Sequence, residues 1–471
     1  MKFREAIDSI EGLRLLYDIT PVVSPLGRAA ILESEFIRDA AELDRELQEV
    51  ETAVEMLSRQ EFAPTVERLS RALMQARDIS STLTRLEGNA TLDDVELFEV
   101  KGLAITAEEV RAALAGTPLE SVESVVPPEL QEVVAELDPE HTGSRHFHIY
   151  NAYSDELAAR RRELEDVRRR HLTESEIKLL TDCIELENKI RARLSALLYC
   201  YVPSLMTALE CLRRLDLLTA KARLATDLNL SRPRIEPDGT LLSYEGLRYL
   251  PVERMLEGLK RKFQPVDITL QEGTTLITGA NMGGKTITLR SVAMAQAMAQ
   301  FGFYVPARKA ILTPVYRIQL SMGDRQSVLT GLSSFGAEII KIDEIVKFSR
   351  LGNRYLNLID EPARTTNPEE GRAIVEAVVD LLGDAESFSL ITTHYSGVEG
   401  AGRRYRVKGL REGAIPAHIS PSRLGEIMDY TLELHDDTDV GRDALRIARM
   451  LSISPAFARS IESHLSPPLQ S

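Results

Sequence analysis

Eight residues in the second half of the chain constrain its fold more than any other part of the sequence. Residues Gly279–Thr286 follow the pattern glycine, four residues, glycine, lysine, threonine, between the apolar run Thr274–Thr278 and a helical run from Ile287. Glycines let the backbone amides of such a loop turn towards a phosphate, and the N-terminus of the following helix adds partial positive charge. The sequence therefore predicts a strand, a phosphate-binding loop and a helix in succession.

The side chains of this loop have separate expected roles. We expect Lys285 to reach the β- and γ-phosphates of ATP, and the hydroxyl of Thr286 to bind Mg²⁺. ATP and Mg²⁺ are therefore the expected cofactors. The candidate nucleotide-binding residues of the loop are Gly279, Ala280, Asn281, Met282, Gly283, Gly284, Lys285, Thr286 and Ile287.

Two further apolar runs end in residues that fit the same chemistry. Tyr355–Ile359 is followed by Asp360 and Glu361, and in folds with a phosphate loop such a pair places one acid on Mg²⁺ and the other beside the attacking water. Ser387–Thr393 is followed by His394, which could sense the γ-phosphate, although a lone histidine is usually structural. We expect Asp360 as a metal ligand and Glu361, His394 and Lys285 as catalytic residues.

The order of these runs predicts the architecture. Short apolar strands alternating with helices after about residue 231 predict an α/β domain with a mostly parallel sheet. Before that point, residues 33–86 and 153–226 have apolar residues at helical spacing, which predicts an all-α region. We expect three parts: residues 1–230, an ATPase domain at 231–440 and a helical C-terminal segment at 441–471.

Two long helices are expected to form an antiparallel hairpin that turns at His171–Thr173. The second, Glu174–Val202, would extend about 43 Å at 1.5 Å per residue. Three consecutive arginines, Arg168–Arg170, lie near the turn. They are interpreted as a solvated face that pairs with nearby acids.

Composition excludes several classes of protein. No apolar run of about 18 residues and no apolar signal segment are present, so neither a membrane span nor secretion is expected. The three cysteines have no metal or disulfide spacing, which favours packing roles in the cytoplasm. Residues 1–150 contain 14 Lys and Arg against 30 Asp and Glu, whereas the remainder is nearly neutral. This acidity disfavours nucleic-acid binding.

These motifs together resemble the MutS family, whose ATPase domain is of the ABC type. The resemblance rests on five ordered segments and, in the helical half, on two more. The segments are Thr278–Thr286, Gly302–Ala307, Gly331–Glu338, Asp360–Glu361 and Thr392–Tyr395, with Leu16–Arg28 and Leu212–Ala225 in the helical half. The resemblance implies core and lever helices before the ATPase domain. It also implies a dimer in which Ser333 of one protomer completes the nucleotide site of the other, and adenine stacking by Phe263, which could equally be a core residue.

Departures from the family pattern bear on function. The core-domain resemblance begins within the first 20 residues and the hairpin turns near residue 172, so we expect no mismatch-binding, connector or clamp domain and no C-terminal nuclease domain. Residues Pro362–Gly371 replace the glycine-rich sequence usual after the two acids. Their first seven residues, Pro362–Pro368, look like the MutS-like ATPase subunit of the reactivase for lysine 5,6-aminomutase, an adenosylcobalamin enzyme, as do Asp138-Pro139 and Phe147–Tyr150.

Three functional hypotheses follow. The first is an ATPase that, as a homodimer or with a second reactivase subunit, reactivates a cobalamin-dependent lysine or ornithine aminomutase. The second is a DNA-structure-binding ATPase of mismatch repair or recombination. The third is a nucleotide-gated scaffold that hydrolyses ATP weakly. Absent clamp and mismatch domains and the acidic first third favour the first hypothesis over the second.

Overall fold

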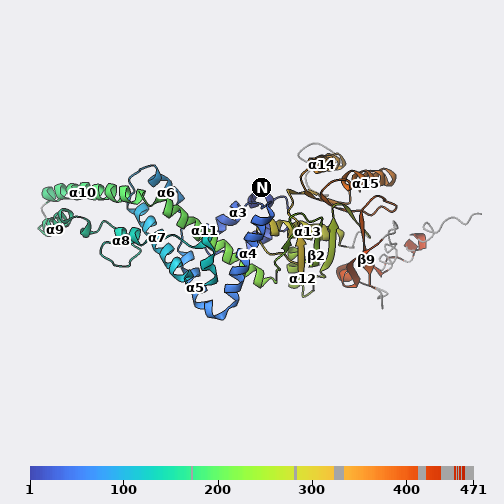
Figure 1. Cartoon of the computed structure of the whole chain (residues 1–471), viewed down its shortest axis with the longest axis horizontal. Coiled ribbons are helices and arrows are strands. Elements are labelled where there is room, and N and C mark those ends of the chain that lie inside the picture. Colours follow the sequence, from blue (N-terminus) through green and yellow to red (C-terminus); the bar gives the residue numbers. More distant parts are fainter. Residues whose placement is uncertain are drawn as a thin grey trace, which may run out of the picture. The chain divides into compact units, whose positions relative to one another are not determined.

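The computed structural model describes residues 1–170, 173–279, 284–322, 334–411, 419 and 421–435, and 450–451, 453–454, 456–457 and 459–461. The chain divides into two compact units. The sheet unit contains Met1–Ile19, Glu35–Leu47 and Asp227–Ser471, and the helical unit contains Thr20–Ser34 and Gln48–Thr226. An all-helical region and an α/β region are therefore present, as predicted (Figure 1).

The observed units differ from the predicted division in their N-terminal part, whereas the change of unit at residues 226–227 lies near the predicted boundary at residue 230. The N-terminal residues of the predicted first domain belong to the sheet unit, because their aromatic side chains are buried there. The ring centroid of Phe301 lies 5.0 Å from that of Phe3 and 5.4 Å from that of Phe36. The amide of Ile37 donates a hydrogen bond of 2.7 Å to the carbonyl of Gln300. Most of the predicted helical C-terminal segment, 441–471, lies outside the described residues.

Within the described residues, the larger sheet has six strands. Their order is β10 (Met428–Leu434), β9 (Arg403–Leu410), β4 (Gly273–Thr278), β8 (Phe388–Thr392), β7 (Tyr355–Asp360) and β6 (Arg317–Ser321). Only β10 is antiparallel to its neighbour. The three apolar runs predicted as strands are thus the adjacent strands β4, β8 and β7, and their carboxyl ends meet at one edge of the sheet.

Helices cover this sheet and fix its strands. The sheet unit contains α1 (Phe3–Ala6), α2 (Leu13–Ile19), α12 (Leu250–Gly258), α13 (Lys285–Gln300), α14 (Ser334–Ser349) and α15 (Pro368–Gly383). Leu276, Ile359 and Ile391 of the central strands pack in one cluster with residues of α14 and α15, including Ile345 and Val375. Because all five side chains are fully buried, the hydrophobic effect holds the strand ends in place.

A smaller sheet, not predicted from the sequence, anchors helix α13. Its strands are, in order, β1 (Arg234–Ile235), β5 (Lys309–Leu312), β2 (Leu241–Leu247) and β3 (Val266–Gln271). On α13, Gln296 accepts a hydrogen bond from the hydroxyl of Tyr244 in β2, and its amide donates to Gln300. Gln300 in turn exchanges hydrogen bonds with the backbone of Val315. These buried amides fix the helix that follows the phosphate loop.

The helical unit is built from nine described helices. They are α3 (Pro25–Glu33), most of α4 (Ala40–Ser58), α5 (Ala63–Met74), α6 (Ser80–Glu87), α7 (Asp94–Leu114), α8 (Gln131–Leu137), α9 (Asp155–Arg169), α10 (Thr173–Tyr199) and nearly all of α11 (Val202–Asp227). Asp216 of α11 is 1% exposed and accepts hydrogen bonds from the amides of Val23 and Ser24 at the start of α3. It thereby joins the two segments that carry the family resemblance in the helical half.

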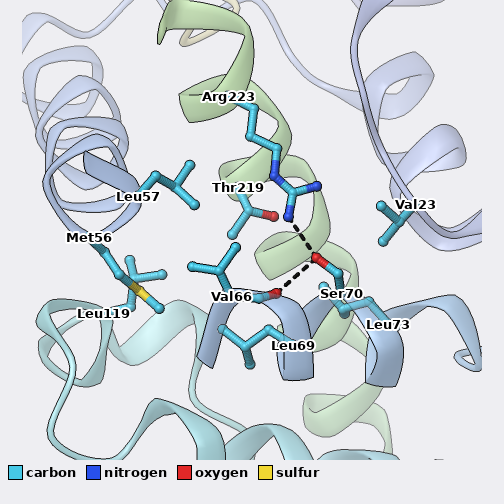
Figure 2. Close-up of a pocket in the computed structure, with 10 residues that line it drawn as sticks. All are labelled: Val23, Met56, Leu57, Val66, Leu69, Ser70, Leu73, Leu119, Thr219 and Arg223. Carbon is cyan, nitrogen blue, oxygen red and sulfur yellow. Dashed lines mark hydrogen bonds between the residues drawn. The ribbon is translucent and has the colours of Figure 1, made fainter. Parts of the chain in front are cut away.

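The interior of the helical unit contains a small cavity of about 10 Å³ (Figure 2). Arg223 of α11 crosses it and donates a hydrogen bond of 2.6 Å to the hydroxyl of Ser70 in α5. The other side chains around it are mostly apolar, among them Leu57, Leu69 and Leu73. A space of this size holds at most about one water molecule, so it is a packing defect and not a ligand site.

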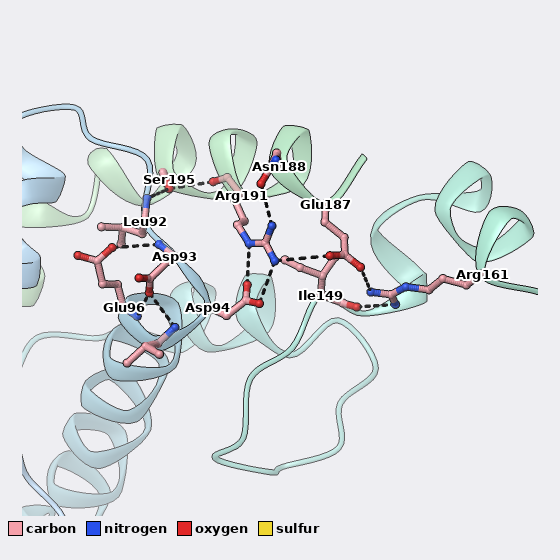
Figure 3. A network of polar contacts seen from close by, with 11 residues as sticks. Leu92, Asp93, Asp94, Glu96, Ile149, Arg161, Glu187, Asn188, Arg191 and Ser195 are labelled. Atoms are coloured by element: carbon pink, nitrogen blue, oxygen red, sulfur yellow. Dashed lines mark hydrogen bonds and ion pairs between the residues drawn. The ribbon is translucent and has the colours of Figure 1, made fainter. Parts of the chain in front are cut away.

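Helices α9 and α10 lie side by side as the predicted hairpin (Figure 1). Only three residues, 170–172, separate them, so no domain is inserted there. Arg191 of α10 makes two hydrogen bonds, of 2.8 and 2.9 Å, to Asp94 at the start of α7, and Arg161 of α9 bonds Glu187 of α10 at 2.8 Å (Figure 3). Paired arginine–carboxylate contacts of this kind fix the direction of the hairpin.

The second arm is shorter than predicted. Helix α10 ends at Tyr199 and not at Val202, where α11 begins with Pro203 in its first turn. Proline cannot continue the preceding helix, and the chain bends there by 72°. Among the described helices, none alone is long and apolar enough to cross a membrane, although the bent pair α10 and α11 together passes by length and composition.

Candidate functional site

The phosphate loop leads from a buried strand directly into a buried helix. Strand β4 ends at Thr278, and α13 begins at Lys285 after Gly284, whose φ of 77° is left-handed. A side chain at Gly284 would also lie 3.1 Å from the ring of Tyr430, so glycine is required there for two reasons. Candidate residues Ala280, Asn281, Met282 and Gly283 lie outside the described residues.

Lys285 lies at the centre of the site and is 3% exposed. Its ammonium group donates a hydrogen bond of 2.7 Å to the carbonyl of Gly279 and lies 3.0 Å from a carboxylate oxygen of Glu361. The lysine is thus held between the first residue of the loop and the second acid of β7. Glu361 presents a negative charge to the ammonium group, and Gly279 presents the negative end of a carbonyl dipole. A phosphate oxygen would take the place of such a partner.

Asp360 joins three elements at the end of the sheet. One carboxylate oxygen accepts a hydrogen bond of 2.7 Å from the hydroxyl of Thr286, the second residue of α13. The other accepts one of 2.7 Å from the hydroxyl of Thr392, which faces Asp360 across the ladder between β7 and β8. Thr286 and Asp360 therefore present two oxygen atoms side by side.

Glu361 is held by its backbone as well as by its side chain. Its φ is 45°, in the left-handed region, and its amide donates a hydrogen bond of 2.9 Å to the hydroxyl of Thr392. The guanidinium of Arg364 lies 3.6 Å from its second carboxylate oxygen. Two residues on, Ala363 is also left-handed, with a φ of 60°. The chain thus turns sharply after β7 and keeps the carboxylate of Glu361 beside Lys285.

Two side chains form hydrogen bonds with the turn after β7 and hold it in place. The hydroxyl of Tyr395 donates a hydrogen bond of 2.8 Å to the carbonyl of Ala363, whose amide donates to Glu338 of α14 at 3.3 Å. Burial raises the pKa of Glu338, although the hydrogen bond from Ala363 and the charge of Arg364 oppose the rise. The turn is therefore coupled to α14, the helix that follows Ser333 in the chain.

His394 lies one residue before Tyr395, with the two ring centroids 4.3 Å apart. Burial lowers the pKa of His394; the charge of Glu361 raises it, while Lys285 and Arg364 lower it further. Among the described residues no hydrogen-bond partner meets its buried Nδ1 atom. A neutral imidazole with an unused ring nitrogen beside the two charged residues can accept or donate a proton or bind a phosphate oxygen.

The remaining candidates lie at the edge of the described site or outside it. Ile287 is in the first turn of α13, and Ser333 lies outside the described residues. Phe263 is partly buried in the segment before β3. The next residue, Gln264, bonds Asp429 at 2.8 Å and the amide of Tyr430, whose ring faces Gly284. This segment is therefore linked through Tyr430 to Gly284, the residue before α13.

Sequence reasoning missed the residues that hold the catalytic groups in place. Thr392, Glu338 and Tyr395 were part of the quoted motifs, but no role follows from their spacing along the chain. Their contacts arise from strand register and from the packing of α14. For Thr392 the signal was available, because a threonine in a parallel strand next to β7 can face the first acid.

The geometry fits a nucleoside triphosphate with Mg²⁺. Hydroxyl and carboxylate oxygens, as in Thr286 and Asp360, are the ligands that Mg²⁺ prefers, and it usually keeps phosphate and water oxygens in its remaining positions. Within the part of the chain that is described, no group of three or more His, Cys, Asp or Glu side chains could hold a metal by itself. A site with few protein ligands is what a phosphate-bound Mg²⁺ requires.

A phosphate loop with its lysine after β4, and paired acids at the end of the parallel strand β7 on the other side of β8, define a P-loop nucleoside triphosphatase. Residues 275–411 match the profile of the family described as MutS domain V, so this region is a MutS-type ATPase domain.

Curated relatives are named Endonuclease MutS2. That of Carboxydothermus hydrogenoformans is 30% identical over 284 residues, which are 60% of this chain and 34% of the relative. That of Lactobacillus helveticus is 35% identical over 214 residues, 45% of this chain and 26% of the relative. The chain thus spans about a third or less of the length of the relatives it matches.

Proposed function

We propose that this chain couples ATP hydrolysis at the described site to movement of its helical unit. The observation that carries the hydrolytic part of the proposal is the contact of Lys285 with Glu361, beside the paired oxygens of Thr286 and Asp360. When ATP binds, its phosphates replace Glu361 as the partner of Lys285. Glu361 then becomes free to orient and deprotonate the attacking water.

The other residues complete the proposed roles. Thr286 and Asp360 would hold Mg²⁺, which neutralises phosphate charge when it is bound. His394 contacts the γ-phosphate and reports its presence through Tyr395 to the turn after β7. Thr392 positions both acids through its hydroxyl. Hydrolysis removes the γ-phosphate and allows Lys285 to return to Glu361.

The site is proposed to be composite. ATPases of the MutS family typically act as dimers, and Ser333 is the candidate that a partner would supply. We expect a mixture of Lys285→Ala and Ser333→Ala protomers to recover turnover, because each mixed dimer contains one site with both residues intact. If the mixture hydrolyses ATP no faster than either variant alone, Ser333 does not act across the interface.

The proposed client is a cobalamin-dependent lysine or ornithine aminomutase that has lost its active cofactor. Support comes from the sequence Pro362–Pro368 after the two acids, from the short turn between α9 and α10, and from the acidic residues 1–150, which suit a basic protein partner. The test is recovery of inactivated aminomutase with ATP, Mg²⁺ and fresh adenosylcobalamin, with and without a second reactivase subunit. Equal recovery without ATP would contradict the proposal.

A second candidate is a DNA-structure-binding ATPase, favoured by the name of the relatives, Endonuclease MutS2. The excess of acids in residues 1–150 opposes it, because it offers no counterion release. At physiological salt we expect binding no tighter than about 10⁻⁴–10⁻⁶ M to homoduplex, mismatched and branched DNA alike. Nanomolar, structure-selective binding in a gel-shift series would make this candidate the better one.

A further inference from the structure

A second candidate site lies wholly within the helical unit. A cavity of about 410 Å³ opens between the C-terminal end of α5, the segment that follows it, α7 and the loop before Ile149. Pockets of 300–1,000 Å³ are typical for small organic ligands. Its walls contain apolar side chains, such as Ile79, Phe98 and Leu103, beside the charged side chains of Arg77, Glu99 and Arg145.

Gly102 shows that the cavity is built into helix α7. It is an interior residue of the 21-residue helix Asp94–Leu114, where glycine is the poorest residue after proline. Apart from its own stretch of helix, a Cβ atom there would meet nothing within 4 Å, so packing does not require the glycine. Its carbonyl accepts a hydrogen bond of 2.8 Å from the hydroxyl of Thr106. The missing side chain leaves open space in a cavity wall where a ligand can approach the backbone.

The charged groups around Gly102 are oriented by neighbours. The side chain of Arg145 is 28% exposed. It donates a hydrogen bond of 2.8 Å to the hydroxyl of Thr106 and forms an ion pair of 2.5 Å with the carboxylate of Glu109. Arg77 is exposed, and its guanidinium lies over the ring of Phe98, 5.9 Å from the centroid. Both arginines line the cavity, where an anionic group can accept from Arg77 and from the N–H groups that Thr106 and Glu109 leave unused on Arg145.

Glu99 provides a negatively charged hydrogen-bond acceptor at the same cavity. One of its carboxylate oxygens accepts a hydrogen bond of 2.5 Å from the hydroxyl of Thr82, and the other can accept an N–H group. A ligand that suits the cavity therefore carries an amide N–H and a carboxylate close together. It also carries an apolar group for Ile79, Phe98 and Leu103.

We infer that this cavity binds an N-acylated amino acid end: a carboxylate beside an amide N–H and an apolar side chain. A free N-acyl amino acid and the C-terminal residue of a peptide share this chemistry. Arg77 and Arg145 bind the carboxylate, Glu99 accepts the amide N–H, and the apolar wall takes the side chain.

The test measures binding of N-acetyl-leucine and of its amide to the full chain by ligand-observed NMR and calorimetry. We expect the acid to bind and the amide to bind at least about tenfold more weakly, because it lacks the charge that the arginines recognise. A pentapeptide with a free C-terminal leucine, compared with its C-terminal amide, identifies the source. Binding of the peptide about tenfold tighter than N-acetyl-leucine indicates a chain terminus, and equal binding indicates a small molecule.

Variants distinguish the site from adventitious binding. Arg77→Ala should weaken binding of the acid about tenfold, whereas Arg71→Ala, an exposed arginine of α5 outside the cavity, should leave it unchanged. Gly102→Met should fill the cavity and abolish binding. The thermal midpoints of Gly102→Met and Gly102→Ala should equal or exceed that of the unmodified chain, because methionine and alanine favour helix more than glycine does. No binding by the unmodified chain, equal binding of acid and amide, or full binding by folded Gly102→Met would overturn the inference.

Discussion

Thr392 is expected to be as important for turnover as the acids it contacts. Its hydroxyl is fully buried, donates to Asp360 and accepts the amide of Glu361. Thr392→Val keeps the shape of the side chain and removes both hydrogen bonds. The backbone amide of Glu361 then loses its acceptor in a left-handed turn, and the carboxylate of Asp360 loses one hydrogen-bond donor.

The expected cost can be estimated from these two contacts. A hydrogen bond to a charged group contributes about 1.5–3 kcal/mol, and an unsatisfied buried amide costs about 1–3 kcal/mol. We therefore expect Thr392→Val to destabilise the protein by about 3 kcal/mol. Displacement of Glu361 by about 1 Å should also lower turnover by about 10²-fold.

Thr275→Val is the matched control. Thr275 lies on the neighbouring strand β4, is also fully buried, and its hydroxyl has no hydrogen-bond partner among the described residues. Removing that hydroxyl should leave turnover unchanged and stability equal or slightly higher. The assay compares ATP turnover and the thermal midpoint of both variants. If Thr392→Val and Thr275→Val have equal turnover and equal thermal midpoints, the hydroxyl of Thr392 does not position the two acids.

Three further predictions concern the turn, the histidine and the helical unit. Ala363→Gly should raise stability by about 0.5–1 kcal/mol, because alanine is strained at a φ of 60°; a lower thermal midpoint would contradict this. Because burial lowers the pKa of His394, the unfolded chain takes up a proton first as pH falls below about 6.5, so stability should decrease there, and less in His394→Gln. Burial alone would raise the pKa of Asp138, but hydrogen bonds from Thr142 and Gly143 and the charge of Lys101 lower it to about 2. The native chain should therefore lose stability between about pH 4 and pH 2 in acid titrations monitored by circular dichroism, and Asp138→Asn should lack this component.

Local patterns predicted the elements of the ATPase region, and spatial packing supplied the rest. The three strands β4, β7 and β8 follow from their apolar runs, and Lys285, Asp360 and Glu361 follow from their places at strand and helix ends. The smaller sheet was not predicted, because its short strands alternate and pair over long separations. Helix α10 was predicted too long: the expected helix runs to Val202, directly before Pro203, whereas Val202 and Pro203 already belong to the first turn of α11.

The side chains of the middle region show a different limit. Asp138 and Tyr150 were quoted only as part of a family signature. In the structure, the buried ammonium of Lys101 lies 3.3 Å from Asp138 and donates 3.1 Å to the hydroxyl of Tyr150. These partners are 37 and 49 residues away in the chain, so no local pattern indicates the contact. The two signature residues are explained by the stability of the helical unit, because an unpaired buried charge is costly.

The measurement that tests the central claim most directly is ATP binding and turnover in two variants of the pair at the centre of the site. Glu361→Gln should bind ATP and Mg²⁺ at least as tightly as the native chain and lose turnover, because the amide cannot deprotonate water and no longer neutralises Lys285. Lys285→Ala should lose ATP binding itself. Loss of binding in both variants, or undiminished turnover in Glu361→Gln, would contradict the account.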